Sequence, residues 1–566
     1  MSGWRTVLTL VLLACGSDGA RGAPAEPATV APAAPYPPGP YGSKVGEILE
    51  DRTLTGLTAA GVPGKISYAS LRTKRNLVIR VQAGFCGTCR TSAEHAADAI
   101  PPVVREESEI LDIVVRDEDG AAPTPESAVA VRWQKLQDVR TTVAVDSAAS
   151  LVVDGRRLPR VLIVDPPSMK ILADLDDPTP RAIAAAIEHD VPEELVDGRF
   201  TRTQWAMIQA FPLEGPPPPD PSNAVADDLG ASVLGFQLFK DEGLGPSERV
   251  SCNSCHEVDR QFTDGGDKPT RGVGHAERNT PTVVLAAWQR WQFWDGRADT
   301  LWQQALGPLE NPEEFGSSRS WVAHRIANHW REAYESVFGP MPRIDDATRF
   351  PFDAKPGDSA WERMAPADQE IITRIFVNVG KAMAAYERTF AVTPNAPDRY
   401  AKGDRGALTE AQKDGLAAYF QAGCAQCHWG PRLTDDAFHV LRFPSGHEDF
   451  TADDGRFAGG PRYETAEFRA DSKWADVPQP RRIVTIDDVQ RGAFKTPALR
   501  GAVRTPPYGH GGGVSSLEMA IELHRTRGMP SDAKLATGKA EPWLIAFDRK
   551  LSAPLLELLT TLDFAR

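Results

Sequence analysis

The sequence predicts a multidomain protein in which an N-terminal α/β domain is followed by two mainly α-helical domains. Three observations lead to this prediction. A hydrophobic, strand-like run ends directly at a Cys-x-x-Cys pair, Cys86 and Cys89, and a helical stretch follows it. The pentapeptide Cys-x-x-Cys-His occurs twice later in the chain, at residues 252–256 and 424–428. A proline-rich break at residues 212–227 separates the first of these features from the other two.

The composition is that of a globular chain with room for substantial cores. Of the 566 residues, 41% are hydrophobic and 25% are charged, which is close to the average for folded domains. This length predicts three or four domains of ordinary size. The net charge of −14 argues against a nucleic-acid partner, because binding to phosphates needs positive charge.

The N-terminus has the features of an export signal, predicted over residues 1–15. The apolar run 7–14 is too short to span a bilayer. It ends at Cys15 in a sequence similar to the bacterial lipoprotein cleavage box, in which the cysteine is lipidated; an ordinary signal cut near Ala20 is the alternative. We therefore expect the periplasm or the outer surface of a bacterial membrane as the location, with a lipid anchor as the only membrane attachment. The Ala/Pro-rich residues 16–41 are predicted to be an extended tether.

Residues 42–200 are predicted to form the α/β domain. The buried strand 76–85 runs into Cys86, and a helix is expected over residues 90–99. At a helix N-terminus the first thiol of such a pair has a lowered pKa and becomes a nucleophile, so Cys86 and Cys89 are a candidate redox dithiol. The alternative is a structural disulfide that holds the corner between strand and helix.

This arrangement resembles the thioredoxin-like (redoxin) fold over roughly residues 42–190. In that fold a proline in the cis conformation packs against the dithiol, and the resemblance assigns this position to Pro159, at the head of a β-branched strand. Residues 181–188 correspond to the closing helix. Phe85 and Thr88 stand where thioredoxins usually carry Trp and Pro, so the resemblance does not carry over a redox potential, which residues within the motif tune.

Cys-x-x-Cys-His is the attachment sequence for c-type haem, in which two thiols bond to the haem vinyl groups and the adjoining His binds the iron. Four of the seven cysteines fall in the two motifs, namely Cys252, Cys255, Cys424 and Cys427. His256 and His428 are then the iron ligands. A pair of structural zinc sites is the alternative, but no second ligand pair stands nearby at zinc spacing. We therefore expect two covalently bound c-type haems.

Each haem motif is expected to lie in its own helical, cytochrome-c-like domain, over residues 228–400 and 401–566. A short amphipathic helix precedes each motif, and the second of these helices opens with a capping box formed by Thr409 and Gln412. The proline-rich residues 212–227 are predicted to be a stiff linker before these two domains.

The C-terminal half, from about residue 228 to residue 565, resembles the bacterial diheme cytochrome c peroxidase family. Besides the haem motifs, the resemblance rests on segments that follow one another in the family's order. They are residues 238–241 (LFKD), 278–281 (RNTP), 293–298 (FWDGRA), 304–308 (QALGP), 311–314 (NPEE), 454–456 (DGR), 494–500 (FKTPALR) and 507–510 (PYGH). The resemblance implies a peroxidase whose two haems have different roles.

In the first haem domain the resemblance implies the peroxidatic site, with His256 as the proximal ligand. It assigns the distal acid–base role to Glu314, with Gln304 in the same pocket, and the position between the two haems to Trp294. Splitting hydrogen peroxide needs such a group to move a proton between the two oxygens. The adjacent carboxylate Glu313 competes with Glu314 for this role.

Two further histidines are candidate iron ligands by resemblance. His275, in a glycine-rich loop, corresponds to a histidine that caps the resting peroxidatic haem; an exposed loop histidine is the alternative. His524 stands where typical peroxidases carry Met, and where a diheme branch that oxidises protein side chains carries Tyr. It shares an apolar helix face with Ile521, whereas the rival Met519 points away. A histidine at this position predicts a lower reduction potential than a methionine would give.

A calcium ion between the haems is a further implication of the resemblance. Asn279, with the backbone carbonyls of Thr505 and Pro507, matches the protein ligands, and water would complete a shell of oxygen atoms.

The leading functional hypothesis is therefore the reduction of hydrogen peroxide to water with electrons passed between two haems. The expected partners are hydrogen peroxide and either a small periplasmic electron donor, a cytochrome or a cupredoxin, or a thiol-redox partner; whether the family's homodimer forms is left open. One alternative is an oxidase-like diheme enzyme that uses peroxide to oxidise a protein or a small molecule. Another is a non-enzymatic electron-transfer protein with a thiol-redox domain, in which His275 and His524 are permanent ligands.

Overall fold

The computed structural model describes residues 35–124, 128–265, 272–446 and 453–564. The predicted export signal, Cys15 and most of the predicted tether therefore lie outside the described residues. From Pro37 onward the chain forms one unit of packed elements. Among the helices of the described ranges, none has both the length and the apolar composition that a membrane crossing requires.

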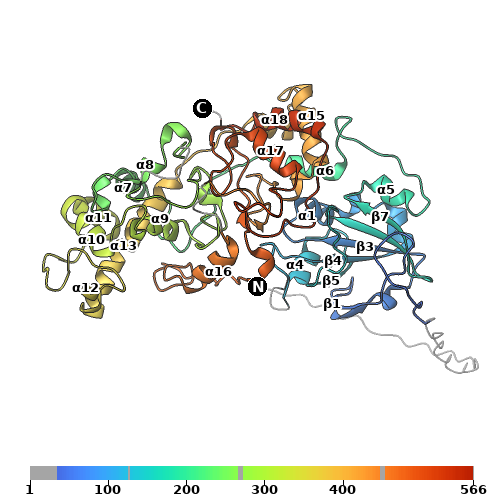
Figure 1. The fold of residues 1–566 in the computed structure, drawn as a ribbon, viewed down its shortest axis with the longest axis horizontal. Coiled ribbons are helices and arrows are strands. Elements are labelled where there is room, and N and C mark those ends of the chain that lie inside the picture. Colours follow the sequence, from blue (N-terminus) through green and yellow to red (C-terminus); the bar gives the residue numbers. More distant parts are fainter. Residues whose placement is uncertain (1–34, 125–127, 266–271, 447–452, 565–566) are drawn as a thin grey trace, which may run out of the picture. The chain divides into compact units, whose positions relative to one another are not determined.

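The N-terminal part is built on a seven-stranded mixed sheet with the order β2-β1-β5-β4-β3-β6-β7. Its strands are β1 (Thr53–Leu57), β2 (Pro63–Ser67), β3 (Asn76–Gln82), β4 (Ser108–Val114), β5 (Thr142–Val145), β6 (Arg160–Asp165) and β7 (Lys170–Asp176). Strands β3, β4 and β5 are parallel, and β6 runs antiparallel to β3; Figure 1 shows these central strands as neighbouring blue to cyan arrows. Every residue of β3 is buried, as expected for a central strand that is covered on both faces.

Helices connect and cover these strands: α1 (Gly87–Glu94), α2 (Ala96–Ala99), α3 (Pro102–Glu107), α4 (Val129–Leu136) and α5 (Pro180–Ala185). The order of strand, Cys-x-x-Cys and helix, followed by an antiparallel strand pair and a closing helix, is that of the thioredoxin-like fold and confirms the predicted fold class. The helix predicted over residues 90–99 begins earlier, because Cys86 is the N-cap of α1, and it breaks at His95 into α1 and α2.

The C-terminal part is mainly helical, as predicted. Its longest helix, α13 (Pro366–Glu387), packs against α7 (Leu229–Phe239) and α9 (Leu301–Glu310) in the core of the first haem region. The other helices of this region are α8 (Cys252–Cys255), α10 (Arg319–Arg325), α11 (Arg331–Phe338) and α12 (Ser359–Glu362). Figure 1 shows α7, α9, α11 and α13 gathered together in green and yellow.

The second haem region has a core of its own, in which α15 (Glu410–Gln421) packs on α18 (Ser552–Leu559). The remaining elements of this part are α14 (Ala396–Ala401), α16 (Arg456–Thr465), α17 (Leu517–Arg525) and the strand pair β8 (Phe438–His439) and β9 (Phe494–Lys495). Thr409 and Gln412 form both bonds of the predicted capping box at the start of α15.

Two segments that precede the predicted haem domains in the sequence pack into the haem regions. Helix α6 (Arg202–Gln209) and its neighbours Phe200 and Phe211 belong to the core of the second haem region. The proline-rich residues 212–227, predicted as a linker, pack against the first haem region: the Trp302 indole donates to the Ser222 hydroxyl at 2.9 Å. Because its turns satisfy buried polar groups, this segment is part of the core instead of a free spacer.

Candidate haem site

One cavity of about 1120 Å³ lies between the two haem-attachment segments. This is larger than the cavities of roughly 300–1,000 Å³ that hold single small molecules. The predicted site residues that line it are Cys255, His256, His275, Asn279, Trp294, Gln304, Glu314, Cys424, Cys427, His428, Thr505, Pro507 and His524. The fold therefore brings together residues that are widely separated in the chain.

The first attachment motif holds its histidine in the tautomer that a metal needs. The Nδ1 atom of His256 lies 2.9 Å from the carbonyl oxygen of Phe262. A carbonyl only accepts hydrogen bonds, so Nδ1 carries the proton and Nε2 is left with a free lone pair. Burial lowers the pKa of His256, which keeps the ring neutral and able to bind iron.

Of the two adjacent glutamates, Glu314 has the environment of an acid–base group. It is partly buried in the cavity wall, and the Asn311 amide donates to its Oε1 at 2.6 Å. Burial raises the pKa of Glu314 above its ordinary value, although Asn311 and Arg297 act in the opposite direction. Glu313 is exposed, and its Oε2 accepts a 3.1 Å hydrogen bond from the backbone N–H of His275.

His275 lines the cavity and is itself an exposed residue of the loop that Glu313 holds. Its backbone is fixed by the bond to Glu313 and by the neighbouring bond from the Gly274 N–H to the Glu313 carbonyl. The loop therefore carries a histidine at the rim of the first site.

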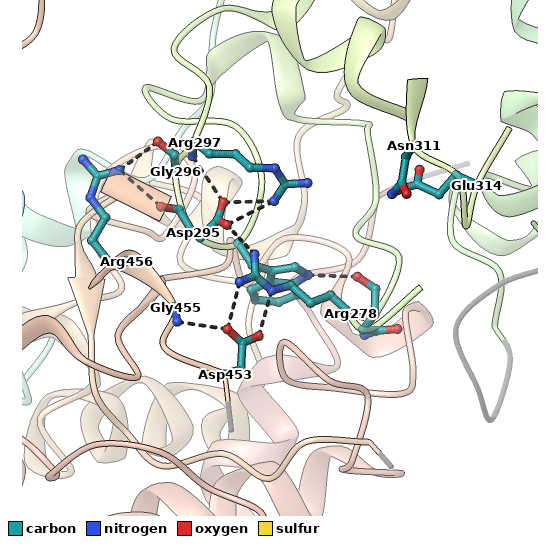
Figure 2. Close-up of polar contacts among 11 residues, drawn as sticks. Arg278, Asp295, Gly296, Arg297, Asn311, Glu314, Asp453, Gly455 and Arg456 are labelled. Carbon is teal, nitrogen blue, oxygen red and sulfur yellow. Dashed lines mark hydrogen bonds and ion pairs between the residues drawn. The ribbon is translucent and has the colours of Figure 1, made fainter. Parts of the chain in front are cut away.

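An ion-pair network lies beside this site. Figure 2 shows Arg278 between two carboxylates, Asp295 at 2.7 Å and Asp453 at 2.8 Å, with Asn311 and Glu314 apart from the network. Asp295 also binds Arg297 at 3.0 Å. The adjacent Arg456 donates to the carbonyl oxygen of Gly296 at 2.8 Å. These bonds hold the turn that follows Trp294 in one conformation.

Trp294 itself is fixed by a hydrogen bond from its indole Nε1 to the carbonyl oxygen of Asn279, at 2.9 Å. The Asn279 side chain in turn donates to the carbonyl oxygen of Pro507 at 2.7 Å. Two of the predicted calcium-binding groups are thus adjacent, and Thr505 lines the same cavity. Gln304, on α9, lines the wall near Glu314.

At the second motif two histidines face one another. The Nδ1 of His428 lies 3.1 Å from the carbonyl oxygen of Leu433, and the Nδ1 of His524 lies 2.7 Å from that of Ala520, so both Nε2 atoms carry free lone pairs. Burial, with a contribution from the neighbouring His524, lowers the pKa of His428 to about 4. Burial also lowers the pKa of His524.

The two rings have centroids 6.3 Å apart. Two imidazoles on opposite sides of one metal, each at a metal–nitrogen distance of about 2 Å with the ring centre roughly 1 Å further out, give a separation of about 6 Å. Met519 is 48% exposed, and its sulfur accepts from the Ser515 hydroxyl. The donor set of this site, two thiols and two oriented imidazoles, fits a covalently attached haem.

The Cys-x-x-Cys pair of the thioredoxin-like domain is a disulfide, and both cysteines are fully buried. The peptide bond between Leu158 and Pro159 is cis. The Thr88 hydroxyl donates to the carbonyl oxygen of Leu158 at 3.2 Å, so the proline segment packs beside the disulfide.

Comparison with known proteins identifies the family of this chain. A sequence model of the family described as di-haem cytochrome c peroxidase matches residues 231–406. The cytochrome c551 peroxidase of Pseudomonas aeruginosa is 34% identical over 300 residues, which are 51% of this chain and 70% of that protein. The chain belongs to the di-haem cytochrome c peroxidase family.

Another relative within this range of similarity is the methylamine utilization protein MauG of Methylorubrum extorquens. It is 33% identical over 296 residues, or 51% of this chain and 67% of that protein. A crystal structure of the diheme peroxidase BthA from Burkholderia thailandensis aligns with 61% of this chain and 89% of its own at 21% identity and a TM-score of 0.45.

Membership in the di-haem cytochrome c peroxidase family implies two c-type haems, and both motifs of this chain have the thiols and oriented imidazoles to hold them.

One part of the second site was not predicted. His439 bonds to Glu541 through Nδ1 and to Asp435 through Nε2, both at 2.9 Å, and the ring lies beside the Cys427 sulfur. Burial opposes the charged ring, but the neighbouring carboxylates of Glu541 and Asp435 raise the pKa of His439 above its ordinary value. Nothing in the spacing of these residues signals their contact.

Proposed function

We propose that this protein is a diheme peroxidase that reduces hydrogen peroxide to two waters with electrons passed between two haem sites. The observation that carries the proposal is the position of Glu314. Its carboxyl group, whose pKa burial raises, lines the same cavity as the oriented imidazole of His256. A general acid–base group works best when its pKa is close to the working pH, and a raised pKa moves a carboxyl group in that direction.

When bound, the haem at His256 supplies an iron coordination position for peroxide, and the haem at His428 supplies a second centre that stores an electron. Glu314 would accept a proton from one oxygen of the peroxide and deliver it to the other oxygen, which leaves as water. The Asn311 amide orients the Glu314 carboxyl through the 2.6 Å bond. Gln304 and Arg297 line the same pocket and provide hydrogen bonds and positive charge beside the reacting oxygens.

Trp294 is the proposed electron relay between the two haem sites. Its indole is held by the Asn279 carbonyl, and its ring lines the cavity that both attachment motifs share. His524 is the proposed second ligand at the His428 site. His275 is the proposed cap of the first site, displaced when that site becomes active.

We further propose a calcium ion at Asn279, Thr505 and Pro507, supported by the position of all three residues in the wall of one cavity. The export and lipidation features of residues 1–15 support a location in the periplasm or on the outer surface of a bacterial membrane. A small soluble cytochrome, a cupredoxin or a thiol-redox protein is then the external electron source.

The experiment compares Glu314→Gln with Glu313→Gln in the haem-loaded protein, with peroxide consumption measured under an excess of ascorbate and a mediator. Glu314→Gln should lower turnover by about 10²–10⁴-fold, the usual contribution of a general acid–base group. Both haem spectra should be unchanged. Glu313→Gln should retain turnover within a factor of about three, because that side chain is exposed and is already bonded to the loop backbone at His275. Equal losses in both variants would remove Glu314 from its role.

A second candidate is an oxidase-like enzyme that uses peroxide to oxidise a protein or a small molecule. The pairing of His428 with His524 favours it, because two imidazoles stabilise the oxidised iron more than an imidazole and a thioether do. Optical spectra after addition of peroxide separate the two. A rapid return to the resting spectrum after ascorbate is added indicates the peroxidase. An oxidised spectrum that persists for minutes after ascorbate is added indicates the oxidase-like enzyme. If the spectra of both haems stay unchanged with peroxide in every redox state, the remaining interpretation is a non-enzymatic electron-transfer protein.

A further inference from the structure

The disulfide of the thioredoxin-like domain lies against the second haem-attachment segment. A Cβ atom added to Gly87, between Cys86 and Cys89, would lie 2.4 Å from the Trp429 ring and 2.5 Å from the carbonyl oxygen of Ala425. Ala425 is itself between the two haem-binding cysteines, and Trp429 directly follows His428. The middle of one Cys-x-x-Cys motif therefore touches the middle of the other.

A direct hydrogen bond joins the two segments. The indole Nε1 of Trp429 donates to the carbonyl oxygen of Phe85 at 2.9 Å. Phe85 precedes Cys86 and Trp429 follows His428, so this single bond connects the residue next to the dithiol with the residue next to an iron ligand. Arg90, on α1, lies over the Trp429 ring at 5.4 Å and fixes its orientation.

A second contact runs beside the first. The Phe85 ring packs edge-on against His439 with centroids 4.5 Å apart. The His439 ring lies beside the sulfur of Cys427, one of the two haem-attachment cysteines. Aromatic side chains thus fill the space between the disulfide and the second haem site on two sides.

This packing closes the dithiol to outside partners. Cys86 and Cys89 are both 0% exposed, whereas a cysteine that reacts with another protein is partly exposed. The segment in direct contact with this pair is the second haem-attachment segment, through Trp429 and Ala425. A dithiol that no partner protein can reach has either a purely structural role or an internal electron acceptor.

We propose that the Cys86–Cys89 dithiol is an internal two-electron donor, which passes electrons through Trp429 to the His428 site and from there to peroxide. The proposal rests on the peroxidase activity proposed above. In this step Cys86 and Cys89 lose two electrons and two protons, and a sulfur–sulfur bond forms between them. Hydrogen peroxide gains two electrons and two protons, its oxygen–oxygen bond breaks, and two waters result. The two-electron oxidation of one dithiol thus matches the reduction of one peroxide.

The test follows the thiols directly. The haem-loaded protein is treated with a phosphine reductant under anaerobic conditions, desalted, and mixed with one equivalent of hydrogen peroxide. Samples are quenched in acid with an alkylating agent, and peptide mass spectrometry measures the alkylation of Cys86 and Cys89. We expect both thiols to disappear together as fast as peroxide is consumed. A disulfide that resists the phosphine in the folded protein, or thiols that persist after peroxide is gone, would overturn the proposal.

Glu314→Gln shows whether peroxide attacks the thiols directly. Since this substitution removes peroxide activation at the first site, it should slow thiol oxidation along with peroxide consumption. Thiol oxidation at the wild-type rate in this variant would mean that peroxide reacts directly with the thiols, which would contradict the proposal.

Gly87→Ala tests the contact itself. The new methyl group must push Trp429 and Ala425 away, and thiol oxidation should slow by about tenfold or more, since displacements of about 1 Å have effects of this size. Peroxide consumption with ascorbate and a mediator should stay unchanged. Gly64→Ala is the matched control, because nothing lies within 4 Å of its added Cβ; it should match the wild type in both measurements. A wild-type rate of thiol oxidation in Gly87→Ala would overturn the proposal.

Trp429→Phe provides a second test if Gly87→Ala fails to fold. It keeps an aromatic ring but removes the hydrogen bond to Phe85, so thiol oxidation should slow while peroxide consumption with ascorbate persists. Thiol oxidation at the wild-type rate in Trp429→Phe would contradict electron transfer through Trp429. The ascorbate measurement on the wild type keeps the two proposals distinguishable: no turnover refutes the peroxidase, whereas normal turnover with unreacted thiols refutes only the internal donor.

Discussion

The imidazole rings of His428 and His524 face each other across the second haem site, with centroids 6.3 Å apart and planes inclined by 57°. Each ring is anchored through Nδ1 to a main-chain carbonyl, so the two Nε2 atoms are left for a metal between them. This pairing distinguishes the second site from the first, where Glu314 and the exposed His275 line the cavity.

The first prediction concerns the ligand at this site. His524→Met should raise the reduction potential of the second haem, because a thioether stabilises ferrous iron more than an imidazole does. Spectroelectrochemical titration of the loaded protein measures the shift. Met519→Leu is the control, and its potential should equal that of the wild type because this side chain is exposed. An unshifted potential in His524→Met would assign the ligand to another residue.

The second prediction is the pH dependence of turnover. Burial raises the pKa of Glu314, and the carboxylate form is the one that accepts the peroxide proton. As the pH falls through this raised pKa, kcat/KM for peroxide should decline by about tenfold per pH unit. In Glu314→Gln this acid limb should be absent and the residual activity flat. An acid limb that survives unchanged in the variant would mean that another group titrates.

The third prediction is a pH dependence of stability in the thioredoxin-like domain. Burial, with the neighbouring charge of Asp119, raises the pKa of Asp117 from 3.8 to about 7. Between these two values the folded state keeps a proton that the unfolded chain has lost, so the free energy of unfolding falls as the pH rises, by up to about 1.4 kcal/mol per pH unit.

Asp117→Asn should remove this contribution and flatten the dependence of Tm on pH between about pH 4 and pH 7. Thermal unfolding followed by circular dichroism at several pH values measures it. The exposed Asp532 offers a matched control: Asp532→Asn should leave the wild-type slope in place. If Asp117→Asn shows that slope too, Asp117 does not hold its proton in the folded state.

The fourth prediction compares a buried with an exposed ion pair. Arg80 and Asp112 are directly opposite on β3 and β4, are 1% and 0% exposed, and are joined by bonds of 2.5 and 2.7 Å. Asp112→Ala leaves a buried guanidinium uncompensated and should cost about 3–5 kcal/mol of unfolding free energy. In the exposed pair of Arg343 and Asp345, Asp345→Ala should change the free energy of unfolding far less, because water screens the charges of an exposed pair. Urea unfolding measures both, and similar small losses would contradict the prediction.

Several elements could be predicted from local sequence. The buried run that becomes β3, the helix after Cys86 and the capping box of Thr409 depend on residues close together in the chain. The break of the first helix at His95 was not predicted, because the helical pattern continues through it. The packing of residues 212–227 into the first haem region was also missed, since proline-rich composition indicates stiffness and says nothing about what the segment contacts.

By itself the sequence determined that the chain carries two haem-attachment motifs and a thioredoxin-like dithiol, because each signature lies within a few consecutive residues whose chemistry is specific. Only the tertiary structure decided which neighbours those motifs have. It partly buried Glu314 while leaving Glu313 exposed, and it placed Phe85 in a hydrogen bond with Trp429, 344 residues away. Side-chain direction and contacts between distant segments arise from packing the whole chain, which no local pattern encodes.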